Sequence, residues 1–277
     1  MPEPASRPIR FAINRMVAPR LGIDQFLALA VAAGAEAVEV RNDVEGQEFA
    51  DGTPAAELRK RIAGHGLAVA SINALQRFND WTAAREREAK ALFAYASALG
   101  ASGIVLCPVV DAKHVWSEAD LARKLREALT AIREIAADSG VIGYVEPLGM
   151  VDSTLRSQRL AAEAIADVAG AGPLQICHDT FQFHRASDDR LHSELIGLVH
   201  VSGITRTGVP RDRLTEPDRG FVDAGDTCGN VRQLRDLRRG GYAGFVSMEP
   251  FDPALHALAD VTAPLARSFE YLRANCQ

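Results

Sequence analysis

The sequence has few cysteines and no long apolar run. Its four cysteines are far apart and show no C-x-x-C spacing, which argues against a thiolate metal motif. Two of them lie in apolar, strand-like runs, where we expect reduced, buried thiols. The four cysteines are Cys107, Cys177, Cys228 and Cys276. No apolar run approaches the ~18–20 residues that span a bilayer, so no membrane partner is expected. Residues Met1–Arg10 are polar and lack a signal-peptide core, so we expect a cytoplasmic protein.

A surplus of basic residues is also absent. The net charge is −5 over 277 residues, which argues against a nucleic-acid partner or an anionic lipid surface. No G-x-G-x-x-G follows the first expected strand, and no Walker-type loop occurs, which disfavours a dinucleotide-binding fold. Hydrophobic residues make up 47% and charged residues 24%, the balance of a globular protein with a large core.

Short apolar runs alternate with longer amphipathic stretches along the whole chain. The runs predict strands at Ile9–Asn14, Ala37–Arg41, Leu67–Asn73, Gly103–Cys107, Ile142–Glu146, Leu174–His178, Gly197–Ser202 and Gly244–Met248. The amphipathic stretches predict helices at Asp24–Ala33, Pro54–Ala63, Thr82–Leu99, Ser117–Asp138, Ser153–Ala169, a short one near Asp188, Asn230–Arg239 and Pro253–Tyr271. Eight strand–helix units at this length favour an α/β fold, a closed (β/α)8 TIM barrel, formed as a single domain over residues 1–277.

One long connection interrupts this pattern, from about Gly203 to Thr227, and it is rich in Arg, Asp and Glu. Long loops in compact domains are usually functional or disordered. Because this one leaves the C-terminal end of a barrel strand, we expect it to cover a substrate.

Good metal ligands stand at the C-terminal ends of four successive strands, and these ends meet at one mouth of a barrel. They are Glu146, Asp179, His200 and Glu249. Three carboxylates around one point repel each other unless a cation lies among them. The mixed oxygen and nitrogen set suits one divalent metal ion: Mn, Mg, Co or Zn. His178 is an alternative to Asp179, but strand alternation points the two side chains in opposite directions and favours Asp179.

Other polar residues are expected at the same mouth. Asn14, Arg41 and Asn73 end the first three strands, and His184 follows Asp179 by five residues. Their amide, guanidinium and imidazole groups can bind the hydroxyls of a polyol. A structural role is an equally good interpretation for each of them taken alone.

Several short segments, spread over nearly the whole chain, match a known family. They are Ala37–Arg41, Ser71–Leu75, Phe78–Asn79, Val145–Glu146, Asp179–His184, Leu198–His200, Leu214–Arg219, Asp223–Asp226 and Val246–Glu249. With them the chain resembles the sugar phosphate isomerase/epimerase superfamily, which has a xylose-isomerase-like TIM barrel. The 2-keto-myo-inositol (inosose) isomerases of inositol catabolism are the nearest branch. The resemblance implies that the four residues named above ligate the metal and that Glu146 and Glu249 also act as the acid/base pair.

One position departs from the family pattern. These proteins usually carry a substrate-contacting His three residues after the strand-six Asp, where this chain has Gln182. Gln hydrogen-bonds but does not titrate, and His184 is a candidate to take over part of that role. Arg206 lies six residues after His200, as does a substrate-binding Arg in some ketose epimerases. Together with Arg219 of the long loop, it is a further substrate-binding candidate.

These features predict a metal-dependent isomerase of a cyclic polyol ketone or ketose, acting through a cis-enediolate. A ketose 3-epimerase, or a dehydratase of the inosose or dehydroshikimate type, would use the same site. A non-catalytic polyol-binding protein stays open because of Gln182. A DNA-repair endonuclease fits less well, since it needs ligands for three metals and a basic groove. Barrels of this kind are often dimers or tetramers, so a homo-oligomer is also open.

Overall fold

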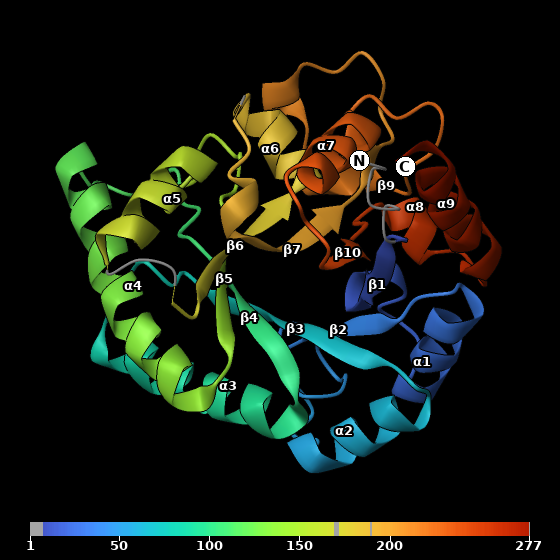
Figure 1. The fold of residues 1–277 in the computed structure, drawn as a ribbon, viewed down its shortest axis with the longest axis horizontal. Coiled ribbons are helices and arrows are strands. Elements are labelled where there is room, and N and C mark those ends of the chain that lie inside the picture. The colour runs from blue at the N-terminus through green and yellow to red at the C-terminus, as the bar shows by residue number, and fades with distance from the viewer. Residues whose placement is uncertain (1–7, 169–171, 189, 277) are drawn as a thin grey trace, which may run out of the picture.

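Eight parallel strands close into a barrel in a computed structural model that describes residues 8–168, 172–188 and 190–276 (Figure 1). The order around the barrel is β1-β10-β7-β6-β5-β4-β3-β2. The strands are β1 (Arg10–Asn14), β2 (Ala37–Arg41), β3 (Ala68–Gln76), β4 (Ala101–Cys107), β5 (Ile142–Val145), β6 (Leu174–Asp179), β7 (Ile196–Val201) and β10 (Phe245–Met248). The predicted (β/α)8 barrel is confirmed.

Helices surround the barrel on the outside (Figure 1). They are α1 (Ile23–Ala32), α2 (Ala55–Gly64), α3 (Ala83–Leu99), α4 (Glu118–Ser139), α5 (Gln158–Asp167), α6 (Thr180–Ala186), α7 (Asn230–Arg239), α8 (Pro253–His256) and α9 (Thr262–Asn275). The residue that begins the predicted helix Ser117–Asp138 is the N-cap of α4, because Ser117 Oγ accepts a hydrogen bond from the backbone N–H of Asp120. None of the helices among the described residues is long and apolar enough to cross a membrane.

Two helices in the middle of the chain differ from the prediction. The segment predicted as Ser153–Ala169 becomes helical only at Gln158, because Ser153 pairs with Val110 in an antiparallel bridge and Ser157 caps the helix. Its predicted last residue, Ala169, lies outside the described residues. The helix expected near Asp188 is α6, which begins directly after β6.

The predicted final helix Pro253–Tyr271 is two helices, α8 and α9. Residues 257–261 separate them, and Asp260 Oδ1 accepts a hydrogen bond from the backbone N–H of Thr262. This side-chain bond to the backbone competes with a continuous helix and begins a new one instead. Apolar spacing alone did not show the break.

The long connection after β7 is ordered. It folds back on itself as an antiparallel pair of short strands, β8 (Gly203–Ile204) and β9 (Arg219–Gly220). Glycine is needed at this crossing, because a Cβ on Gly203 would lie 2.4 Å from the carbonyl oxygen of Phe221. The pairing returns the chain to the mouth of the barrel at Arg219.

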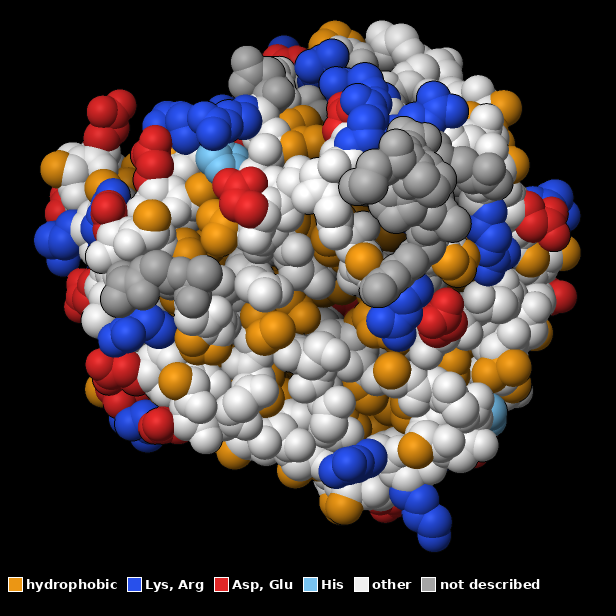
Figure 2. All heavy atoms as spheres, viewed as in Figure 1, with side chains coloured by type: hydrophobic (Ala, Val, Ile, Leu, Met, Phe, Trp, Pro, Cys, Tyr) orange, Lys and Arg blue, Asp and Glu red, His pale blue; other side chains and the backbone are white. Residues whose placement is uncertain are grey.

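The barrel interior is lined mostly by small apolar side chains, together with the larger Tyr144 and Leu198. They are Ala12, Ala37, Ala70, Ala74, Val105, Cys107, Tyr144, Cys177 and Leu198. A second, larger cluster fills the space between the strands and the surrounding helices. In the space-filling view, acidic and basic side chains are interspersed around the rim of one face (Figure 2). The small interior residues leave room at the C-terminal end for polar side chains.

Candidate metal centre

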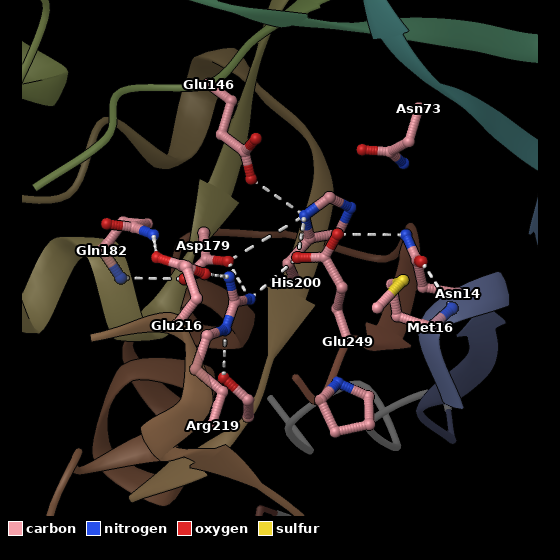
Figure 3. A network of polar contacts seen from close by, with 12 residues as sticks. Asn14, Met16, Asn73, Glu146, Asp179, Gln182, His200, Glu216, Arg219 and Glu249 are labelled. Atoms are coloured by element: carbon pink, nitrogen blue, oxygen red, sulfur yellow. Dashed lines mark hydrogen bonds and ion pairs between the residues drawn. The ribbon is translucent and has the colours of Figure 1, made fainter. Parts of the chain in front are cut away.

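Four strands bring the predicted ligand residues together at the C-terminal end of the barrel (Figure 3). Glu146 follows β5, Asp179 ends β6, His200 lies in β7, and Glu249 follows β10. One nitrogen or oxygen atom from each lies within 4.8 Å of the others. Each residue is at most 5% exposed. We call these four residues the acidic cluster.

His200 lies at the middle of the acidic cluster. Its Nδ1 atom is 2.9 Å from Glu146 Oε1, 3.3 Å from Glu249 Oε2 and 4.0 Å from Asp179 Oδ2. One ring nitrogen therefore faces all three carboxylates at once.

Electrostatics in the acidic cluster favour a cation. Burial raises the pKa of Asp179 to about 7; the neighbouring Arg219 opposes this rise, and the carboxylates of Glu146 and Glu249 add to it. Carboxylates crowded in this way ionise together only when a positive charge lies among them. Three carboxylates and one imidazole suit a divalent ion of the Mn, Mg, Co or Zn type, so the donor set fits.

Arg219 reaches directly into the acidic cluster. Its Nη2 donates to Asp179 Oδ2 at 2.5 Å and to Glu249 Oε2 at 2.8 Å. Its Nη1 donates to Glu216 Oε2 at 2.7 Å, and Nε donates to Ser202 Oγ. This loop residue, predicted to contact substrate, therefore lies against two members of the cluster.

Arg41 and Asn14 also lie at the mouth, as expected from their positions at strand ends, and both contact Glu249. Arg41 Nη1 is 2.9 Å from Glu249 Oε1, and its other nitrogens donate to Asp43. Asn14 Nδ2 donates to Glu249 Oε1 at 3.1 Å. Both side chains hold Glu249 in place.

Asn73 contacts a buried carboxylate, Glu39, which was not predicted from the sequence. Asn73 Nδ2 donates to Glu39 Oε2 at 2.8 Å, and Glu39 is fully buried in β2. Glu39 Oε2 also lies 3.0 Å from His200 Nε2. The sequence does indicate this residue: Glu39 is a carboxylate within the apolar run Ala37–Val40, and it lies on the same strand face as Arg41.

Gln182 is buried close to the acidic cluster and joins two loops. Its Oε1 accepts a hydrogen bond from the backbone N–H of Gly149 at 3.0 Å, and its Nε2 donates to Glu216 Oε1 at 2.9 Å. Gln182 thus links the loop after β5 to the loop that carries Arg219. Glu216 was not singled out from the sequence.

Two predicted substrate-binding residues have their contacts elsewhere. Arg206 is 54% exposed at its side chain and forms an ion pair with Asp218. His184 lies near Arg211, Asp226 and Arg232, and burial lowers its pKa. Among the described residues, neither Arg206 nor His184 makes a hydrogen bond or ion pair with the acidic cluster.

His178 lies on the opposite side of β6 from Asp179, as the strand alternation predicted. Its Nδ1 contacts Gln158 Nε2 of α5 at 2.5 Å, and its Nε2 lies 3.0 Å from Gln233 Oε1 of α7. Burial lowers the pKa of His178 to about 3, so the ring is neutral. His178 therefore ties β6 to two outer helices and is outside the acidic cluster.

Two thiols flank Glu146 inside the barrel. Cys107 Sγ donates to Glu146 Oε2 at 3.4 Å, and Cys177 Sγ lies 3.8 Å from Glu146 Oε1. All four cysteines are buried and unpaired, which agrees with the prediction made for the two in strand-like runs. Glu146 is therefore surrounded by weak, neutral donors and by His200.

Comparison with known proteins agrees with this architecture. A xylose isomerase domain-containing protein from Salmonella typhimurium LT2 is 29% identical, with a TM-score of 0.87 over 99% of this chain and 100% of that chain. The IolI protein, solved with a bound zinc atom, is 19% identical, with a TM-score of 0.85 over 97% and 98% of the two chains. An L-ribulose 3-epimerase is 19% identical, with a TM-score of 0.71 over 97% and 94%.

A search of curated proteins finds no match. A family model described as the xylose isomerase-like TIM barrel matches residues 27–275, almost the whole chain. The match covers every strand of the barrel except β1 and all four residues of the acidic cluster. The chain therefore belongs to the xylose isomerase-like TIM-barrel family.

Proposed function

We propose that this chain is a divalent-metal-dependent isomerase of a cyclic polyol ketone or ketose, with an inosose such as 2-keto-myo-inositol as the preferred substrate. The observation that carries the proposal is the buried cluster of Glu146, Asp179, His200 and Glu249 at the C-terminal face of the barrel. Structural similarity to the zinc-containing IolI protein and to an L-ribulose 3-epimerase supports it.

The four residues of the acidic cluster would hold the metal. When bound, a divalent ion supplies Lewis-acid polarisation of the substrate's carbonyl and neighbouring hydroxyl oxygens. Arg219 adds a fixed positive charge beside Asp179 and Glu249. This guanidinium is placed to bind a substrate oxygen that gains negative charge during the reaction.

Proton transfer in the isomerisation is assigned to Glu146, which acts first as the base and then as the acid. It removes the proton from the carbon that bears the hydroxyl, which leaves a cis-enediolate. The hydroxyl proton passes to the former carbonyl oxygen. The proton on Glu146 exchanges with solvent, and Glu146 then protonates the former carbonyl carbon, so ketone and alcohol exchange places. Glu249 is less suited to begin, because Arg41, Arg219 and Asn14 all stabilise its carboxylate form.

A ketose 3-epimerase is the second candidate. Glu146 and Glu249 approach His200 from different sides (Figure 3). If Glu146 removes a proton from one face of the substrate and Glu249 returns one to the opposite face of the same carbon, the result is epimerisation. Similarity to the L-ribulose 3-epimerase favours keeping this reaction in the test.

Proton NMR in D2O tests the proposal, with metal-reconstituted protein and 2-keto-myo-inositol. A new inosose that carries deuterium at the former carbonyl carbon is the expected product. A 1,2-diketone formed by loss of one water would identify a dehydratase instead. If the inosose stays unchanged and unlabelled, the proposed substrate is excluded, and ketohexoses then test the epimerase.

Loss of metal on purification, together with no exchange of substrate protons, would indicate a polyol-binding protein. The matched control for either reaction is Glu146→Gln, assayed at measured metal occupancy. This variant keeps the size of the side chain but cannot accept a proton as a carboxylate does.

A further inference from the structure

Glu39 is a fully buried carboxylate that lies behind the acidic cluster. It has 0% exposure in β2, and its Oε2 atom is 3.0 Å from His200 Nε2. Within the described part of the chain, His200 is its only partner able to carry a positive charge. A buried carboxylate is costly unless its oxygens are hydrogen-bonded and a donor of positive character lies nearby.

Neutral donors from neighbouring strands fix the orientation of Glu39. Asn73 Nδ2 donates to Glu39 Oε2 at 2.8 Å, and Ser71 Oγ donates to the same oxygen. Asn14 Nδ2 lies 3.5 Å from Oε1. Because β1 and β3 supply these donors from both sides of β2, the carboxylate is held facing the imidazole.

The two nitrogens of His200 face different surroundings. Nδ1 faces Glu146, Glu249 and Asp179, whereas Nε2 faces Glu39 and no other carboxylate of residues 8–168, 172–188 and 190–276. A neutral imidazole has one N–H group and one lone pair. If Nδ1 gives its lone pair to a cation, the proton must be on Nε2, where a carboxylate can accept it.

We propose that Glu39 is a positioning residue that holds the Nε2–H tautomer of His200 and thereby sets the affinity of the centre for its divalent ion. The inference rests on the metal binding of the proposed function, but not on the identity of the substrate. Carboxylate partners of metal-binding histidines orient the ring and raise its basicity as a ligand. Asn73 donates to Glu39, and Glu39 contacts His200, so Asn73 acts on the imidazole through Glu39.

Titration with Co2+ in the absence of substrate tests this role. Glu39→Gln keeps the side-chain shape and removes the charge, and we expect Co2+ affinity to fall by about 10- to 100-fold. The matched control is Glu48→Gln, since Glu48 is a buried carboxylate whose ion-pair partner is Arg15, outside the cluster. This control should bind Co2+ as tightly as the unmodified chain. Equal Co2+ affinity for Glu39→Gln and the unmodified chain would overturn the proposal.

A second measurement reads the tautomer in the unmodified protein and needs no Glu39 variant. Long-range proton–nitrogen NMR of the unmodified Zn2+-loaded protein, with the His200 signals assigned by comparison with His200→Asn, should show a protonated Nε2. A proton on Nδ1, or no Zn2+ binding at all, would contradict the role of Glu39. If the metal binds normally and the expected tautomer is seen, but no inosose or ketose is turned over, only the proposed reaction is contradicted.

Discussion

Glu146 and Glu249 both contact His200, but the groups around them differ. Glu249 accepts hydrogen bonds from Arg41, Arg219 and Asn14. Glu146 has the thiols of Cys107 and Cys177 as its other side-chain partners, and no arginine or lysine forms an ion pair with it in the described part of the chain. One carboxylate therefore has two permanent cations beside it and the other has none.

This difference indicates that the two glutamates have different roles. Burial opposes ionisation of Glu249, but His200, Arg219 and Arg41 outweigh it and lower its pKa. A carboxylate held in this way is a good ligand and a poor base. Glu146, with fewer stabilising contacts, is the better candidate to take up and release a proton during turnover.

The largest expected effect comes from Glu146→Gln. Removal of a general base should lower kcat by about 10²- to 10⁴-fold. Deuterium incorporation into substrate should fall in parallel, because both processes need the same proton abstraction. Turnover and exchange are measured by NMR at equal metal occupancy. Near-normal kcat in this variant would remove Glu146 from the mechanism.

The second effect is on stability and separates the two glutamates. In metal-free protein, Glu249→Gln removes one carboxylate partner from each of two buried arginines, Arg41 and Arg219. Both arginines keep other carboxylate partners, so the loss should be at the low end for a broken buried pair, about 3 kcal/mol of the free energy of unfolding. Glu146→Gln removes a carboxylate that has no arginine partner, so it should cost much less. Urea unfolding in the presence of a chelator compares the two variants. Equal losses would show that the surroundings of the two glutamates are energetically alike.

Metal removal should have a smaller but general effect. A ligand at 100 times its Kd stabilises the folded state by about 2.7 kcal/mol, so chelation should lower the free energy of unfolding by about that amount. The gain on adding Zn2+ or Mn2+ should shrink in Glu146→Gln and Glu249→Gln alike. Thermal unfolding at fixed metal concentration measures it. A metal-independent transition would argue against ligation by these residues.

The smallest effect concerns the loop ion pair outside the acidic cluster. In this pair, Arg206 donates a hydrogen bond to Asp218, and that bond is the main cause that lowers the pKa of Asp218 to about 2. The folded pKa lies below the usual value near 4, so this stabilisation is present above about pH 4 and is lost as pH falls toward 2. Asp218→Asn should flatten that part of the stability–pH curve. The matched Arg206→Met variant should leave the KM for substrate unchanged; a large rise in KM would return Arg206 to the substrate site.

The sequence by itself determined the barrel and the four residues of the acidic cluster. Strand periodicity marked the C-terminal ends of the strands, and parallel strands in a closed barrel must bring those ends together. Glu146, Asp179, His200 and Glu249 were found in this way, and the structure places them within 4.8 Å of one another. Alternation along one strand also separated Asp179 from His178.

Only the tertiary structure decided which other side chains join the cluster. Spacing from His200 made Arg206 a candidate, but the antiparallel pairing of β8 with β9 delivers Arg219 instead, 40 residues after its partner Asp179. Glu39 was overlooked because its partner His200 lies 161 residues away, in a strand that is not its neighbour. Contacts across a barrel or through a folded loop depend on where distant segments meet in space. Local periodicity reports only which face of a strand or helix a residue lies on, so it does not predict those contacts.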